Sequence, residues 1–223
     1  MLLTRRTAIA MTALCASAPV RVLASACCGP ITPAGARLAA FLDSSGVDHL
    51  WLPGYKVNWD TGAMVSAWND DRPHTHCSAF VASAAKRLRV YVLRPPEHSP
   101  VLLANAQMGW LRSPEATSKG WRPVADAAEA QARANRGDLV VAAIENPDPD
   151  RPGHIAIVRP SEIDTATLLA DGPFVTQAGG HNALSVALVH GFANHKGAWA
   201  GNGGGEVRFF AHPVDWSRAE AAT

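Results

Sequence analysis

The spacing of apolar residues changes near the middle of the chain. In the first part, apolar positions recur at the three- and four-residue intervals of an amphipathic helix. These intervals predict helices over residues 33–44, 77–88, 99–111 and 125–135. Gly46 and Gly137 follow the first and the last of these segments, as is typical of helix ends.

After residue 138 the apolar residues come in short runs bounded by Gly, Pro and Asn, which is typical of strands. The runs predict strands over residues 139–144, 154–158, 173–179, 184–189 and 207–212. Helices followed by consecutive strands with short connections indicate an α+β fold with a mainly antiparallel sheet.

Residues 50–76 show neither period, but they are rich in tryptophan, proline and glycine. This composition predicts a long structured loop, and long aromatic loops often line functional sites. We therefore expect Trp68, Asn69 and His76 to contact a substrate.

The amino-terminal 26 residues have the composition of an export signal. Arg5 and Arg6 precede an uncharged stretch over residues 7–20, and small residues end the segment at Ala26. The paired arginines favour the twin-arginine route, with Sec export left open because Ala8 stands where that signal usually carries an aromatic residue. The protein is then expected in the periplasm or outside the cell.

The remaining chain is long enough for one core. We expect a tether over residues 27–36, a single catalytic domain over 37–216 and a tail over 217–223, in a monomeric protein. Leu23 to Cys27 loosely resembles a lipobox, so lipid attachment at Cys27 is the alternative to a free mature end.

Charge and hydropathy exclude two classes of partner. Removal of the signal takes away three of the 20 basic residues, which leaves 17 basic against 19 acidic residues. A slightly acidic chain has little attraction for nucleic acid. After the signal, no apolar run approaches the roughly 20 residues that cross a bilayer.

Three cysteines remain after signal removal, so an oxidising compartment leaves at least one thiol unpaired. Cys27 and Cys28 are adjacent and terminal, which makes Cys77 the expected free thiol. Cys77 begins the helix over 77–88 and lies on its apolar stripe. A helix amino terminus and a neighbouring histidine are both expected to lower its pKa.

His154 begins a predicted strand, at the rim of the sheet on which the Cys77 helix should pack. If residues 154–158 pair with 173–178, His154 lies opposite about Gln177, which could orient its ring. Cysteine on a helix, histidine on a strand and a polar residue on the next strand is the order of papain-like peptidases. Asn182 is the alternative third residue.

Four segments carry a family resemblance: HCSAFVASAAKRL, ANRGDLVVAA, GHIAIV and VTQAGGHN. In this order they resemble the NlpC and CHAP cysteine amidases, which cut peptides of the bacterial cell wall. The resemblance covers about residues 60–190. It departs from the family at His76, where NlpC members usually have Asp, and in the 23-residue gap between His154 and Gln177.

The resemblance implies a papain-like fold and hydrolysis of peptidoglycan amide bonds, with Cys77 as nucleophile, His154 as base and Gln177 as orienting residue. It requires no metal or organic cofactor. Two alternatives stay open from the sequence: a non-catalytic envelope protein that binds wall peptides, and a zinc hydrolase with ligands on His74, His76 and Cys77.

Overall fold

The computed structural model of the chain describes residues 27–70 and 74–219. The predicted export signal over residues 1–26 and the last four residues of the predicted tail lie outside this part. No helix among the residues described combines the length and the apolar character needed to cross a membrane.

The centre of the fold is a six-stranded sheet in which every neighbouring pair is antiparallel, so the chain has the expected α+β organisation. In spatial order the strands are β3 (Arg122–Val124), β8 (Arg208–His212), β4 (Leu139–Ile144), β5 (His154–Val158), β6 (Phe174–Gln177) and β7 (Ala183–Ala187). Every residue of β4 and β5 is buried, because both strands are covered on both faces. This explains their continuous apolar sequences.

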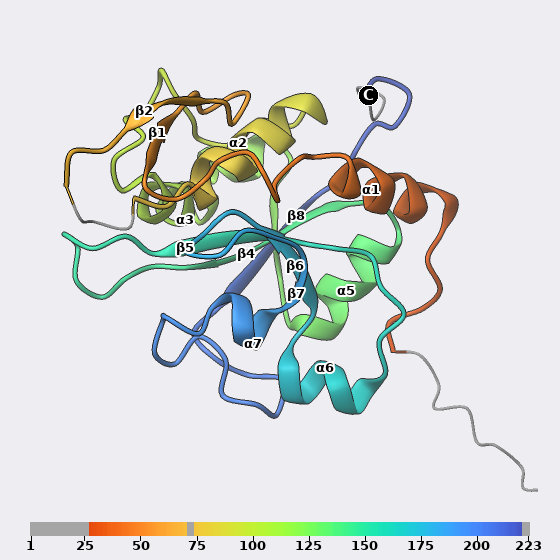
Figure 1. Ribbon diagram of the computed structural model, residues 1–223. Helices are drawn as coiled ribbons and strands as arrows, with labels where there is room; N and C mark the ends of the chain where they lie inside the picture. The colour runs from red at the N-terminus through yellow and green to blue at the C-terminus, as the bar shows by residue number, and fades with distance from the viewer. Residues whose placement is uncertain (1–26, 71–73, 220–223) are drawn as a thin grey trace, which may run out of the picture.

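Helices cover the two faces of this sheet, and each face has its own apolar cluster (Figure 1). One face carries α1 (Pro33–Asp43), α2 (Cys77–Arg87), α3 (Leu103–Leu111) and the short α4 (Pro114–Ser118). The other carries α5 (Ala127–Asn135), α6 (Thr165–Asp171) and α7 (Leu188–Gly191). Side chains of β5 alternate between the clusters: Ile155 and Ile157 face α2, whereas Ala156 and Val158 face the second cluster.

The region predicted as a loop over residues 50–76 contains a two-stranded hairpin of β1 (Tyr55–Val57) and β2 (Met64–Ala67). The prediction of a loop is wrong here because β2 is exposed along its whole length and therefore has no apolar period. Asp60, in the connection between the strands, pairs with Lys86 and accepts a hydrogen bond from Ser83, so the hairpin is fixed to α2.

The predicted helix over 99–111 begins later, at Leu103, because Leu102 adopts a left-handed backbone with φ 53°. Besides β1 and β2, four further elements were not predicted: α4, α6, α7 and β3. Each has seven residues or fewer, which is too short for a helical or strand period to stand out.

Residues 27–36, predicted as a tether, lie against the body of the fold. The backbone N–H of Cys27 donates to the Ile163 carbonyl at 2.7 Å, and α1 already begins at Pro33. Cys27 and Cys28 form a disulfide with each other, so in this structure the Cys27 sulfur is not free for lipid attachment. Cys77 is the free cysteine of the part described, as predicted.

Candidate active site

Cys77 is the first residue of α2 and packs in the same apolar cluster as Ile155. Its side chain is 3% exposed. Burial raises the pKa of the thiol, and the backbone N–H groups of Ile155, Ser78 and Cys77 itself oppose this shift only in part. The shift is opposite to the direction expected from the helix start, because desolvation outweighs the amides. The resting side chain is a thiol at neutral pH.

His154 is the first residue of β5 and is 5% exposed. Its Nε2–H donates to Gln177 Oε1 at 2.9 Å, and Gln177 Nε2 donates in turn to the His181 carbonyl at 3.1 Å. Because the Gln177 amide nitrogen is engaged with a carbonyl, its oxygen faces the ring and fixes the proton on Nε2. Burial lowers the pKa of His154, and the bond to Gln177 raises it in part. The ring is therefore neutral at pH 7, with an unprotonated Nδ1.

The two strands pair antiparallel as predicted, but the register, continued to the start of β5, brings Gly179 rather than Gln177 opposite His154. Ile157 lies opposite Thr176 and Val158 opposite Val175. His154 is four residues from Val158, and Gln177 is two residues from Val175, so both point to the face on which those two valines pack. This common face is what allows the two side chains to meet.

Cys77 and His154 approach the rim of the sheet from opposite faces. The Cys77 thiol lies beside the backbone N–H of Ile155, the residue after His154. The His154 ring makes a T-shaped contact with Phe192 in the second cluster, with ring centroids 4.5 Å apart and 71° between the ring planes. Within the part of the chain described, no hydrogen bond joins the Cys77 sulfur to the His154 ring. The Cys77 thiol thus contacts the backbone of the residue next to His154, whereas the two side chains lie on opposite faces of the sheet, and among the described residues Nδ1 has no hydrogen bond.

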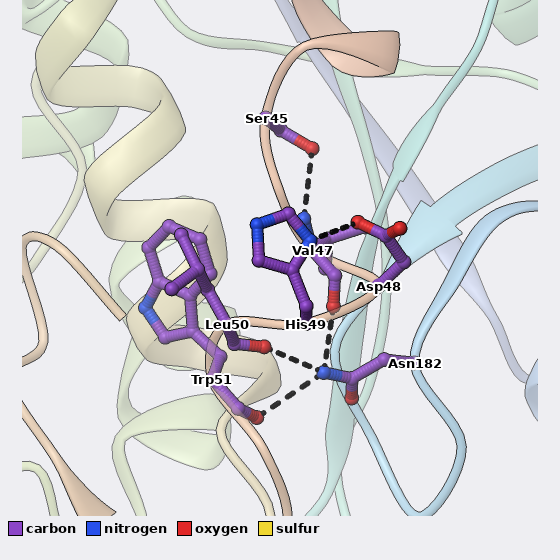
Figure 2. A network of polar contacts seen from close by, with 7 residues as sticks. All are labelled: Ser45, Val47, Asp48, His49, Leu50, Trp51 and Asn182. Atoms are coloured by element: carbon purple, nitrogen blue, oxygen red, sulfur yellow. Dashed lines mark hydrogen bonds and ion pairs between the residues drawn. The ribbon is translucent and has the colours of Figure 1, made fainter. Parts of the chain in front are cut away.

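The side chain of Asn182, the alternative third residue, bonds to the segment after α1 and not to His154 (Figure 2). Its Nδ2 donates to the carbonyls of Val47 and Leu50 at 2.8 Å and of Trp51 at 3.3 Å. Its Oδ1 accepts from the Gly179 N–H at 3.0 Å. The side chain therefore ties the β6–β7 turn to the segment after α1, and Gln177 is the one of the two that reaches His154.

We predict that Asn182→Ala lowers the free energy of unfolding by about 1–3 kcal/mol, because three carbonyls and one N–H lose a partner. Urea unfolding followed by tryptophan fluorescence measures this loss. The rate of Cys77 alkylation should stay close to that of the wild type, with Gln177→Ala as the matched comparison. A larger loss of reactivity in Asn182→Ala than in Gln177→Ala would make Asn182 the orienting residue.

The residues predicted to bind substrate lie at the base of the β1–β2 hairpin, beside the start of α2. His76 Nε2 lies 2.7 Å from the Tyr55 carbonyl, and burial lowers the pKa of His76. Trp68 stacks on His74 with centroids 3.9 Å apart, and Asn69 is exposed. His76 therefore lies directly before Cys77 and bonds to the hairpin, and Trp68 packs on His74, two residues before His76.

His74, His76 and Cys77 do not converge in the way a zinc site requires. His74 bonds to Asp70 at 2.5 Å, whereas His76 turns to the backbone of Tyr55. Among the residues that the structure describes, no three His, Cys, Asp or Glu side chains are grouped so that they could hold a metal. The donor set of the zinc alternative therefore does not fit this geometry.

Asn105 in α3 fixes the connection that leads into His154. Its Oδ1 accepts from the N–H groups of Gly153 at 2.8 Å and Asn146 at 3.2 Å, and its Nδ2 donates to the Arg151 carbonyl at 2.9 Å. Three backbone groups of the β4–β5 connection are thus held by one side chain. No pattern in the sequence indicates this role, because Asn105 lies inside a predominantly apolar helix.

An open groove of about 890 Å³ lies at the same rim, between α3, the β4–β5 connection and the start of β8. It carries the Arg112–Glu145 ion pair, at 2.6 Å, and Arg208. Cys77, His154 and Gln177 do not line it. The groove borders the candidate site through Ile144, which lies opposite His154 in the sheet.

Comparison with known proteins does not assign the chain to a family. No family model matches it, and no curated protein matches it. The resemblance to the NlpC and CHAP amidases therefore depends on the sequence motifs alone.

Proposed function

We propose that this protein is an exported cysteine amidase or endopeptidase with a papain-like fold of the NlpC and CHAP type. In this proposal it hydrolyses peptide bonds of bacterial peptidoglycan. The observation that supports it best is the buried hydrogen bond between His154 and Gln177, at the rim where α2 begins with Cys77. This bond keeps the proton on Nε2, and among the residues that the structure describes Nδ1 has no hydrogen bond, as the acceptor atom of a general base requires.

The resting site suggests a general-base mechanism. Cys77 holds its proton and His154 is neutral, so His154 Nδ1 takes the proton as the sulfur attacks the substrate carbonyl. In the structure the two side chains lie on opposite faces of the sheet, so this transfer requires a rearrangement at the rim that brings the His154 ring to the Cys77 sulfur when substrate binds. Gln177 Oε1 stabilises the imidazolium through Nε2–H.

The start of α2 supplies donors for the oxyanion. The His76 side chain makes no capping bond to the helix, so the first-turn N–H groups, including that of Cys77, are not occupied by it. His154 then returns the proton to the leaving amine, and the acyl group stays on the Cys77 sulfur. Water activated by His154 hydrolyses this thioester and regenerates the thiol.

Digestion of purified walls tests the proposal. Walls of several peptide chemistries are incubated with the wild type and with Cys77→Ala, and the fragments are identified by mass. We expect fragments that appear only with the wild type, and their masses report the bond that is cut. The absence of Cys77-dependent fragments from all wall types would contradict the proposal.

Burial of Cys77 favours a second candidate, a non-catalytic protein that binds wall peptides on the same surface. A 3% exposed thiol with a raised pKa is also what a purely structural cysteine shows. This candidate predicts co-sedimentation with walls that Cys77→Ala leaves unchanged, without fragments. It also predicts slow iodoacetamide labelling that does not respond to His154→Ala.

A further inference from the structure

Another histidine, His195, lies against the candidate base His154. Its ring stacks on that of His154 with centroids 5.7 Å apart and an angle of 13° between the planes. His195 follows α7, in a segment for which the sequence predicts neither a helix nor a strand. Its N–H donates to the Phe192 carbonyl at 2.9 Å, and its carbonyl accepts from the Ala198 N–H at 3.1 Å. Backbone bonds on both sides therefore hold the residue in place.

The His154 ring is enclosed by three side chains. Phe192 packs against it in a T-shaped contact, Gln177 Oε1 accepts the hydrogen bond from Nε2–H, and the His195 ring lies nearly parallel to it. His154 is buried, whereas His195 is half-buried. His195 is thus the member of the enclosure that stands toward solvent.

We propose that His195 is a positioning residue of the site: its ring covers the outer face of His154, excludes water from it and keeps it in the neutral form that accepts the Cys77 proton. This inference rests on the proposed function. His195 itself takes no part in bond making or breaking.

The charged groups around His154 and His195 are compatible with this role of His195. Among the residues that the structure describes, the charged group that acts on this pair is Arg151 in the β4–β5 connection, which lowers the pKa of His195. The pKa of His195 is lowered to about 4, first by burial and then by His154 and Arg151. His195 is therefore uncharged near neutral pH. A neutral ring shields His154 without repelling the imidazolium that forms during the reaction.

The expected change on removing His195 follows from the desolvation of His154. His195→Ala lets water reach the ring and weakens the effect that lowers the pKa of His154, so that pKa rises. The base is neutral above its pKa, and a higher pKa moves the acid limb of the rate profile to higher pH. On that limb hydrolysis should fall by about tenfold, with the plateau rate nearly unchanged. His195→Phe keeps the cover and should retain the wild-type profile.

The test combines an NMR titration of the His154 ring with the pH profile of Cys77-dependent wall hydrolysis. Both are measured for the wild type, His195→Ala and His195→Phe, with thermal unfolding as the check on folding. A rise in the His154 pKa in His195→Ala, absent in His195→Phe, is the expected result. An unchanged pKa and acid limb in His195→Ala, in an enzyme whose hydrolysis depends on Cys77, would overturn the inference alone. If His195→Ala does not fold, the test uses His195→Phe. An acid limb in His195→Phe that is shifted from that of the wild type would then overturn the inference. Failure of the proposed function shows separately, as the absence of Cys77-dependent hydrolysis in the wild type.

Discussion

Cys77→Ala and His154→Ala are each expected to reduce the rate of wall hydrolysis by about 10⁴-fold, and the double variant should be no slower than either single variant. The reason is that the two side chains act in one step of the proposed reaction. The Cys77 thiol has a raised pKa and is a weak nucleophile without a base. His154 without the thiol has no proton to accept. Initial rates of fragment release from one wall preparation, at the plateau of the pH profile, measure the effect.

The matched control is His190→Ala, because His190 is an exposed histidine on α7 and is not in the candidate site. It should retain the wild-type rate. Losses that multiply in the double variant would mean that Cys77 and His154 act independently. A wild-type rate in His154→Ala would exclude His154 as the base.

The pH dependence of Cys77 alkylation is a second test of whether His154 acts as the base for Cys77. The pKa of His154 lies below its usual value and that of Cys77 above its usual value, both through burial. In the wild type, reaction of Cys77 with iodoacetamide is therefore expected to rise with pH through the lowered pKa of His154. In His154→Ala it should rise only where the thiol ionises by itself, at more alkaline pH.

The sequence was most informative where burial is continuous. The strands over 139–144 and 154–158 were predicted with the bounds that the structure has, because β4 and β5 are apolar throughout and end at turn residues. The pairing of His154 with Gln177 also followed from strand order. The long gap between them, which departs from the family pattern, is explained by α6, which lies between β5 and β6.

The sequence was least informative where a property depends on several distant segments. The pKa of Cys77 depends on how completely α2 and β5 bury it, and a helix start alone predicted the wrong direction. His195 lies near His154 because α7, which precedes it, packs on the face of the sheet to which His154 points. Asn182 was the alternative to Gln177 in the sequence, but its side-chain amide bonds to the segment after α1.

Gly153→Ala is expected to have the second large effect, a loss of more than about 3 kcal/mol in the free energy of unfolding. A Cβ at this position would lie 2.1 Å from the Ile144 carbonyl oxygen and 2.6 Å from Asn105 Oδ1. The first atom belongs to the neighbouring strand and cannot move without opening the β4–β5 pair. The second is the acceptor that holds Gly153 in place.

Equilibrium unfolding in urea measures this loss, and Gly180→Ala is the matched control. Gly180 lies in the turn after β6, and a Cβ there would meet only Asn194 Nδ2, at 4.0 Å, so its stability should stay within about 0.5 kcal/mol of the wild type. Wherever Gly153→Ala remains folded, the displaced strand should carry His154 away from Gln177. The NMR signal of the Nε2 proton would then change, whereas in Gly180→Ala it should persist. A Gly153→Ala variant with wild-type stability and an intact Nε2 signal would show that the rim tolerates a side chain, and that the Gly-His pair is not needed to position His154.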